Sequence, residues 1–221
     1  MYNAVVFDMD GVIFDSEVKV VECWQDIAAK YHIEDIEDTC RGCLGLNREA
    51  AKNVFQKRYG SDFPYDVYKS EMSELFHERY SDGRLPLKPG VKGLLTYLKE
   101  HGKKIALASS TRSELVRREL NDAGLLSFFD VVIGGDMVTR SKPEPDIFLK
   151  ACEELNILPE YVYGIEDSYN GIRALSAAGI RAIMVPDMVE ASDEMRKLAE
   201  VVLPDLQIVQ RYLEYEVFKL W

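Results

Sequence analysis

The chain has 221 residues, of which 47% are hydrophobic and 29% charged, and its formal net charge is -11. This composition is typical of a globular protein with a substantial core and excludes a disordered chain. The acidic charge, with no long basic run to offset it, argues against a protein that binds the nucleic-acid backbone.

The first predicted element is a strand at residues 4–7, which ends at Asp8. No basic region precedes this apolar run, and Asp8 and Asp10 interrupt it early. The run is therefore typical of neither a signal peptide nor a membrane span. We expect a cytoplasmic protein with no membrane partner.

The stretch from about residue 16 to residue 82 lacks the apolar runs of buried strands. Apolar residues recur at three- and four-residue steps between Val21 and Tyr31, and residues 49–59 and 66–80 also have helical patterns. We therefore expect a helical insertion. It contains Cys40-x-x-Cys43, which has no second cysteine pair at ligand spacing, so free thiols are expected rather than a zinc site.

Short apolar runs return after the insertion and alternate with helical patterns. The runs lie at residues 104–108, 131–133, 161–165, 181–185 and 201–203. Because they are continuous, they predict strands buried on both faces. Helices are predicted from a capping box at Thr111 and Glu114 to Gly124, from Pro145 to about Asn156, and from a Ser168 cap to Ala178.

This alternation predicts an α/β fold, a doubly wound parallel sheet with helices on both faces. We expect residues 1–15 and 83–221 to form the core domain and residues 16–82 to form an inserted helical cap domain.

Polar side chains follow several of the predicted strands. They are Asp8 and Asp10, Ser109 and Ser110, Glu166 and Asp167, and, in a later loop, Lys142. Ligands bind beyond the carboxyl ends of the strands of such sheets. Carboxylates that converge there repel one another unless a hard cation such as Mg²⁺ lies among them. One carboxylate can then attack a phosphate ester and form an aspartyl-phosphate, and a second can act as acid and base.

Four segments resemble, in order, the four motifs of the haloacid dehalogenase superfamily. They are Asp8-Met9-Asp10-Gly11-Val12, Ala108-Ser109-Ser110, Lys142-Pro143-Glu144-Pro145-Asp146 and Gly164-Ile165-Glu166-Asp167-Ser168, the last continuing through Gly171 to Gly179. Together these motifs span nearly the whole chain, and the helical insertion is similar to the cap that this superfamily places after its first motif.

The resemblance implies a role for each motif residue. Asp8 is the expected nucleophile and a Mg²⁺ ligand, Asp10 the acid/base residue whose backbone carbonyl also contacts the metal, Asp167 a direct metal ligand, Glu166 a supporting residue, and Ser109, Ser110 and Lys142 the phosphoryl-binding residues. Dehalogenases of the superfamily lack the second aspartate. Asp10 therefore favours phosphoryl transfer from a small-molecule phosphate ester.

Within the superfamily, Asp15-Ser16-Glu17 and residues 45–49 resemble the small sugar-phosphate phosphatases and β-phosphoglucomutase. The mutases have a histidine where this chain has Val20, which favours hydrolysis over the alternative, phosphate transfer within a sugar phosphate. A binding module without catalysis is a third hypothesis. Arg48 is either a substrate-binding cap residue or a surface arginine, and no cap lysine has a distinguishing context. We expect a monomer.

Overall fold

The structure, a computed structural model, describes residues 2–43, 46 and 48–218. Gly45 and Asn47, part of the motif stretch at residues 45–49, lie outside these described residues. Among the helices that the structure describes, none is both long enough and apolar enough to cross a bilayer.

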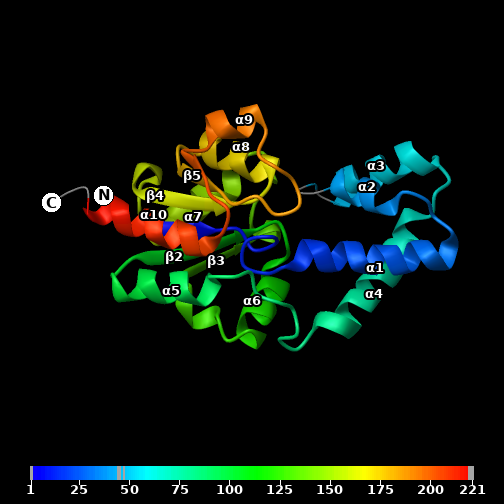
Figure 1. Ribbon diagram of the computed structural model, residues 1–221, viewed down its shortest axis with the longest axis horizontal. Helices are drawn as coiled ribbons and strands as arrows, with labels where there is room; N and C mark the ends of the chain where they lie inside the picture. The colour runs from blue at the N-terminus through cyan, green and yellow to red at the C-terminus, as the bar shows by residue number, and fades with distance from the viewer. Residues whose placement is uncertain (1, 44–45, 47, 219–221) are drawn as a thin grey trace.

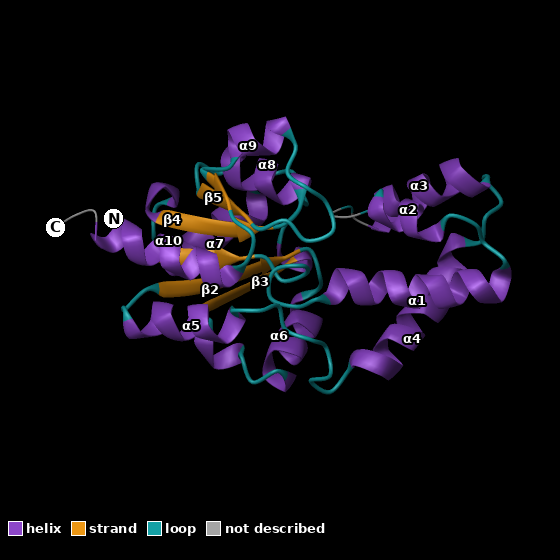
Figure 2. Ribbon diagram, in the orientation of Figure 1, coloured by secondary structure: helices purple, strands orange, loops and turns teal. Residues whose placement is uncertain are grey.

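Among the described residues, six parallel strands form one sheet in the order β3-β2-β1-β4-β5-β6. Figures 1 and 2 show this sheet with helices on both sides. The strands are β1 Ala4–Phe7, β2 Lys104–Ser109, β3 Val131–Gly134, β4 Val162–Glu166, β5 Arg181–Met184 and β6 Val201–Val202. Phe7, the last residue of β1, lies opposite Leu107 on one side and Ile165 on the other. The predicted doubly wound parallel fold is confirmed.

Alternate residues of the strands enter different cores, because successive side chains point to opposite faces of a sheet. Val5 and Phe7 pack against one group of helices, and Ala4 and Val6 pack against the other. The first group is α5 Val91–Glu100, α6 Ser113–Asp122 and α10 Leu206–Phe218; the second is α7 Asp146–Leu155, α8 Tyr169–Ala177 and α9 Asp193–Leu198. The 3-10 helices are η1 Leu126–Phe128, η2 Gly135–Met137 and η3 Pro159–Tyr161. Both faces of the sheet are therefore buried.

In the part of the chain that the structure describes, a group of helices stands apart from the sheet at one end of the molecule (Figure 1). They are α1 Ser16–Tyr31, α2 Ile36–Arg41, α3 Arg48–Tyr59 and α4 Tyr65–Tyr80. They have a hydrophobic core of their own around Trp24, Phe55 and Met72, with the Trp24 and Phe55 ring centroids 4.7 Å apart. We call these four helices the helical unit and the remainder the sheet unit.

The chain passes twice between the two units, and the two crossings are joined by hydrogen bonds. Asp15 N donates to Pro86 O over 2.9 Å, and Lys88 N donates to Ile13 O over 2.9 Å. The Lys88 ammonium also donates to the Asp15 carboxylate, over 3.3 Å. The two connections are therefore paired, and we call residues 13–15 and 86–88 together the paired hinge.

Local sequence signals identified some helix ends and missed others. Ser168 caps α8 as predicted, accepting a hydrogen bond from Gly171 N over 3.0 Å. The capping box at Thr111 is wrong: α6 begins at Ser113 without a side-chain cap, and the Thr111 hydroxyl donates to Asp10 instead, over 3.3 Å. Helices α2, α5 and α10 were not predicted.

Candidate active site

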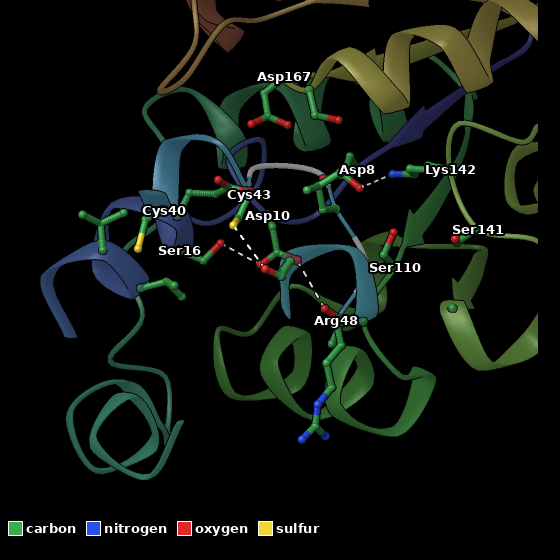
Figure 3. Close-up of a pocket in the computed structure, with 18 of the residues that line it drawn as sticks. Asp8, Asp10, Ser16, Cys40, Cys43, Arg48, Ser110, Ser141, Lys142 and Asp167 are labelled. Atoms are coloured by element: carbon green, nitrogen blue, oxygen red, sulfur yellow. Dashed lines mark hydrogen bonds and ion pairs between the residues drawn. The ribbon is translucent and has the colours of Figure 1, made fainter. Parts of the chain in front are cut away.

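The polar strand ends meet beyond the carboxyl edge of the sheet, on both sides of β1. The strand order reverses there, because β2 and β3 extend the sheet on one side of β1 and β4, β5 and β6 extend it on the other. Such switch points are where open α/β sheets bind ligands. A cavity of about 540 Å³ lies at this position, and both units line it (Figure 3).

Lys142 lies at the centre of a buried ionic group. Its Nζ donates to Asp8 Oδ1 over 2.5 Å, to Glu166 Oε1 over 2.7 Å and to Ala108 O over 3.2 Å. Burial favours the protonated form of Asp8 and outweighs the attraction of Lys142, which raises the pKa of Asp8 to about 8. Burial disfavours the ammonium of Lys142, but Asp8 and Glu166 raise its pKa above the usual value.

Asp8, Glu166 and Asp167 form a compact acidic group. Each contributes a carboxylate oxygen, and these three atoms lie within 4.8 Å of one another. Burial, followed by repulsion from Glu166 and Glu17, raises the pKa of Asp167 well above its usual value. A buried set of carboxylate oxygens is the kind of donor set that Mg²⁺ uses, so these residues fit the expected cation.

Two glycines of the motifs leave room for this group. Gly11 has a φ of 77°, and a Cβ atom there would lie 2.8 Å from Cγ of Asp167. A Cβ atom on Gly171 would overlap the Glu166 carboxylate. Glu166 is held in this space by Ser168, whose N and Oγ donate to Oε2 over 2.9 and 3.0 Å. Any larger residue at Gly11 or Gly171 would displace an acidic side chain.

Asp10 lies beside the acidic group and has different partners. Its carboxylate accepts hydrogen bonds from Ser16 Oγ over 2.7 Å and from Thr111 Oγ1 over 3.3 Å. Burial raises the pKa of Asp10, and the hydrogen bonds from Ser16, Thr111 and Ser109 oppose the shift. Among the described residues, the three-carboxylate group does not include the Asp10 side chain. The Asp10 side chain therefore lies outside the candidate cation site.

The two serines at the end of β2 take different positions. Ser110 is exposed and lines the cavity. Ser109 is fully buried below it, and its hydroxyl accepts a hydrogen bond from Thr111 N over 3.1 Å. Ser110 can reach a bound group directly, while Ser109 also supports Asp10 and Thr111.

The helical unit contributes two cations and a largely apolar wall to the cavity. Arg48 lines it, but its side chain is 70% exposed and pairs with Asp66 over 2.9 Å, turned away from Asp8 and Lys142 (Figure 3). Lys69 of α4 also lines the cavity and has no hydrogen bond or ion pair with a described residue; burial lowers its pKa. The apolar wall includes Val20, Trp24 and Phe55.

Sequence reasoning missed four residues at or beside this cavity: Thr111, Glu17, Lys69 and Asp187. Asp187 follows the end of β5, so the argument from strand ends could have identified it. Glu17 lies in Asp15-Ser16-Glu17, which indicated a resemblance to the small sugar-phosphate phosphatases and β-phosphoglucomutase but no role for Glu17 itself. The side-chain direction of Lys69 depends on how α4 packs, which no local pattern reveals.

Comparisons with known proteins identify the family. The sequence model of the haloacid dehalogenase-like hydrolases matches residues 5–185. A phosphorylated carbohydrates phosphatase from Thermotoga maritima is 33% identical, over 82% of this chain and 83% of its own length. A β-phosphoglucomutase from Bacillus subtilis is 32% identical, over 83% of each chain.

The solved structures include proteins with the same fold. A β-phosphoglucomutase structure from Clostridium difficile superposes with a TM-score of 0.76 at 25% identity, covering 98% of this chain and 100% of that one. The family model matches well over half of the chain, in a segment that contains all four motifs. The chain therefore belongs to the haloacid dehalogenase-like hydrolases.

Proposed function

We propose that the chain is a Mg²⁺-dependent phosphatase that hydrolyses a small phosphate monoester through an aspartyl-phosphate on Asp8. The observation that carries this proposal is the position of Asp8 in the cavity. It is paired with Lys142 on one carboxylate oxygen and lies beside Glu166 and Asp167. A carboxylate nucleophile divides one difficult displacement into two easier steps.

In the first step, an oxygen of Asp8 attacks phosphorus and the bond from phosphorus to the ester oxygen breaks. Asp10 donates its proton to the departing oxygen. In the second step, Asp10 takes a proton from water, whose oxygen attacks phosphorus and releases Asp8. The raised pKa of Asp10 favours the protonated form that the first step needs.

The phosphoryl group needs positive charge and hydrogen-bond donors around it. Lys142 supplies the buried charge. The hydroxyl of Ser110 at the cavity wall is one proposed donor, and that of Ser109, buried below it, is the other. Asp8 and Asp167 would hold the Mg²⁺ ion, with Glu166 in support and the backbone carbonyl of Asp10 as a further ligand. When bound, the ion neutralises charge on the phosphoryl oxygens.

We also propose that residues 16–82 act as a cap and residues 1–15 and 83–221 as the catalytic core. The separate hydrophobic core of the helical unit and the paired hinge support this division. Closure of such a cap excludes water and completes a site. The apolar wall around Val20 and Trp24 suits that purpose.

The relatives named as carbohydrate phosphatase and β-phosphoglucomutase suggest a sugar phosphate or a similar metabolite as the substrate. A phosphosugar mutase is the second candidate, favoured by the mutase names among these relatives. Val20 counts against it, because a valine in the cavity can neither hold nor exchange a proton.

The test is a screen for phosphate release from a panel of phosphorylated metabolites, with and without Mg²⁺. A hexose-phosphate isomerisation assay runs beside it. We expect Mg²⁺-dependent release that the Asp8→Asn variant lacks. Isomerisation with little free phosphate would replace the phosphatase by the mutase, and Mg²⁺ binding without turnover of any ester would leave only a binding module.

A further inference from the structure

Two carboxyl groups beside the acidic group have a buried oxygen without a hydrogen-bond partner among the described residues. They are Oε2 of Glu17, at the start of α1, and Oδ2 of Asp187, in the loop after β5. A buried acceptor without a donor is costly and uncommon in native proteins. We therefore expect a hydrogen-bond donor to bind at each of these two oxygens.

Asp187 is held in one orientation. Its Oδ1 accepts a hydrogen bond from Lys88 Nζ over 2.6 Å, and its side chain is only 7% exposed. The other oxygen faces the acidic group. A Cβ atom on Gly11 would lie 3.3 Å from Oδ2 of Asp187 and 2.8 Å from Cγ of Asp167. The two carboxyl groups therefore border the same space beside Gly11.

Glu17 approaches the same region from the helical unit. It lines the cavity together with Asp8 and Asp167, and the charges that act on it most strongly are those of Asp10, Asp187 and Asp8. Two nearby cations are already engaged, because Lys142 bonds to Asp8 and Glu166, and Lys88 bonds to Oδ1 of Asp187. Lys69, which also lines the cavity, has no hydrogen bond to either unpartnered oxygen. Negative charge is thus in excess around the unpartnered oxygens.

We propose that Glu17 and Asp187 form an outer shell of the cation site, accepting hydrogen bonds from water molecules that the bound Mg²⁺ keeps. This inference rests on the proposed function. Mg²⁺ gives up its water reluctantly and usually keeps several molecules in protein sites. Outer-shell partners orient such a site and contribute to its affinity. Glu17 and Asp187 are therefore positioning residues.

The two outer-shell residues belong to segments that join the two units. Glu17 lies in the first turn of α1, two residues after the hinge residue Asp15. Met188, next to Asp187, packs against the core of the helical unit, and its carbonyl accepts a hydrogen bond from Arg41 Nη1 over 3.0 Å. Glu17 and Asp187 therefore lie where the two units meet.

The test is calorimetric titration of the full chain with MgCl₂ alone, without substrate. Glu17→Gln and Asp187→Asn are each expected to raise the Kd for Mg²⁺ about 10-fold. Glu190→Gln is the matched control, because it removes one exposed carboxylate from the same loop and is expected to leave the Kd unchanged. Ca²⁺, which sheds its water more readily, should lose less affinity in the two variants.

An unchanged Kd for Mg²⁺ in both variants, with one ion bound by the wild type, would overturn the outer shell and leave the proposed function standing. If the wild type binds no Mg²⁺, the proposed function fails with it. Circular dichroism checks that the variants fold. Should either amide variant fail to fold, Glu17→Asp and Asp187→Glu keep the charge but move the oxygen, and an unchanged Kd in both would again overturn the proposal.

Discussion

The carboxyl edge of the sheet and the helical unit line one cavity but present different kinds of side chain. At the sheet edge, Asp8, Lys142, Glu166 and Asp167 are all buried, and Lys142 bonds to two of the carboxylates. The helical unit offers an apolar wall and the cation Lys69, which has no partner among the described residues, while the exposed Arg48 is paired with Asp66.

This difference suggests a division of labour. Groups that must be placed accurately lie at the ends of strands that pair on both sides, whose positions the ladder of hydrogen bonds fixes. On the proposed function, the groups that would distinguish one ester from another lie on helices with a separate core, joined to the sheet through one hinge. Substitutions at the sheet edge should abolish the reaction, and substitutions in the helical unit should change which ester is preferred as the substrate.

Asp8→Asn should have the largest effect. The amide keeps the size of the side chain but is no nucleophile, so we expect kcat to fall on the order of 10⁵-fold. The measurement is phosphate release in the presence of Mg²⁺, with the melting temperature confirming that the variant folds. Wild-type turnover in this variant would contradict the assignment of Asp8 at the sheet edge as the nucleophile.

Asp10→Asn should have the next largest effect. Loss of a general acid and base typically costs about 10²–10⁴-fold in rate. The first turnover on 4-nitrophenyl phosphate should suffer less than that on a sugar phosphate, because its leaving group needs no proton. Single-turnover kinetics measure both. Equal losses on the two esters would argue that Asp10 does not protonate the departing oxygen.

Lys69→Met and Arg48→Met should separate the two cations of the helical unit. We expect the KM of the best substrate to rise about 10-fold for Lys69→Met, the loss of one hydrogen bond to a charged group. Arg48→Met should change it less, because Arg48 is exposed and paired with Asp66. Steady-state kinetics test this order. A larger effect at Arg48 would show that cap closure turns its guanidinium into the site.

The smallest expected effect is a dependence of stability on pH in the metal-free protein. The pKa of Asp8 is raised to about 8 and that of Asp167 is raised as well, so the folded protein holds protons that the unfolded chain has released. The free energy of unfolding should therefore fall as the pH rises from about 4 to about 8. Mg²⁺ competes with these protons, so it should raise Tm by several degrees more at about pH 8 than at about pH 5.5.

Scanning calorimetry at the two pH values, with and without the ion, measures this effect. Asp167→Asn is the control, since it removes one carboxylate of the acidic group and should flatten both dependences. An equal Mg²⁺ shift at both pH values would contradict a site made of protonated carboxyl groups.

The sequence was sufficient to predict the sheet and the motif residues at its edge, but not Asp187 after β5. A buried strand such as β1 is a continuous apolar run, and the polar residue that ends it must lie at the strand's carboxyl end. Thr111 was misassigned because its capping pattern is local, whereas the bond to Asp10 crosses between two strand ends. The outward position of Arg48 and the inward position of Lys69 depend on helix packing, which a single sequence does not specify. The monomeric state and the cytoplasmic location stay predictions.

The central claim is that Asp8 carries the phosphoryl group between the two steps. The most direct measurement is acid quenching of the enzyme during turnover of its best ester, followed by peptide mass spectrometry. We predict a phosphoryl adduct on the peptide that contains Asp8, dependent on Mg²⁺, absent from Asp8→Asn and longer-lived in Asp10→Asn. An adduct on another residue, or turnover without any adduct under conditions that preserve acyl phosphates, would contradict the account.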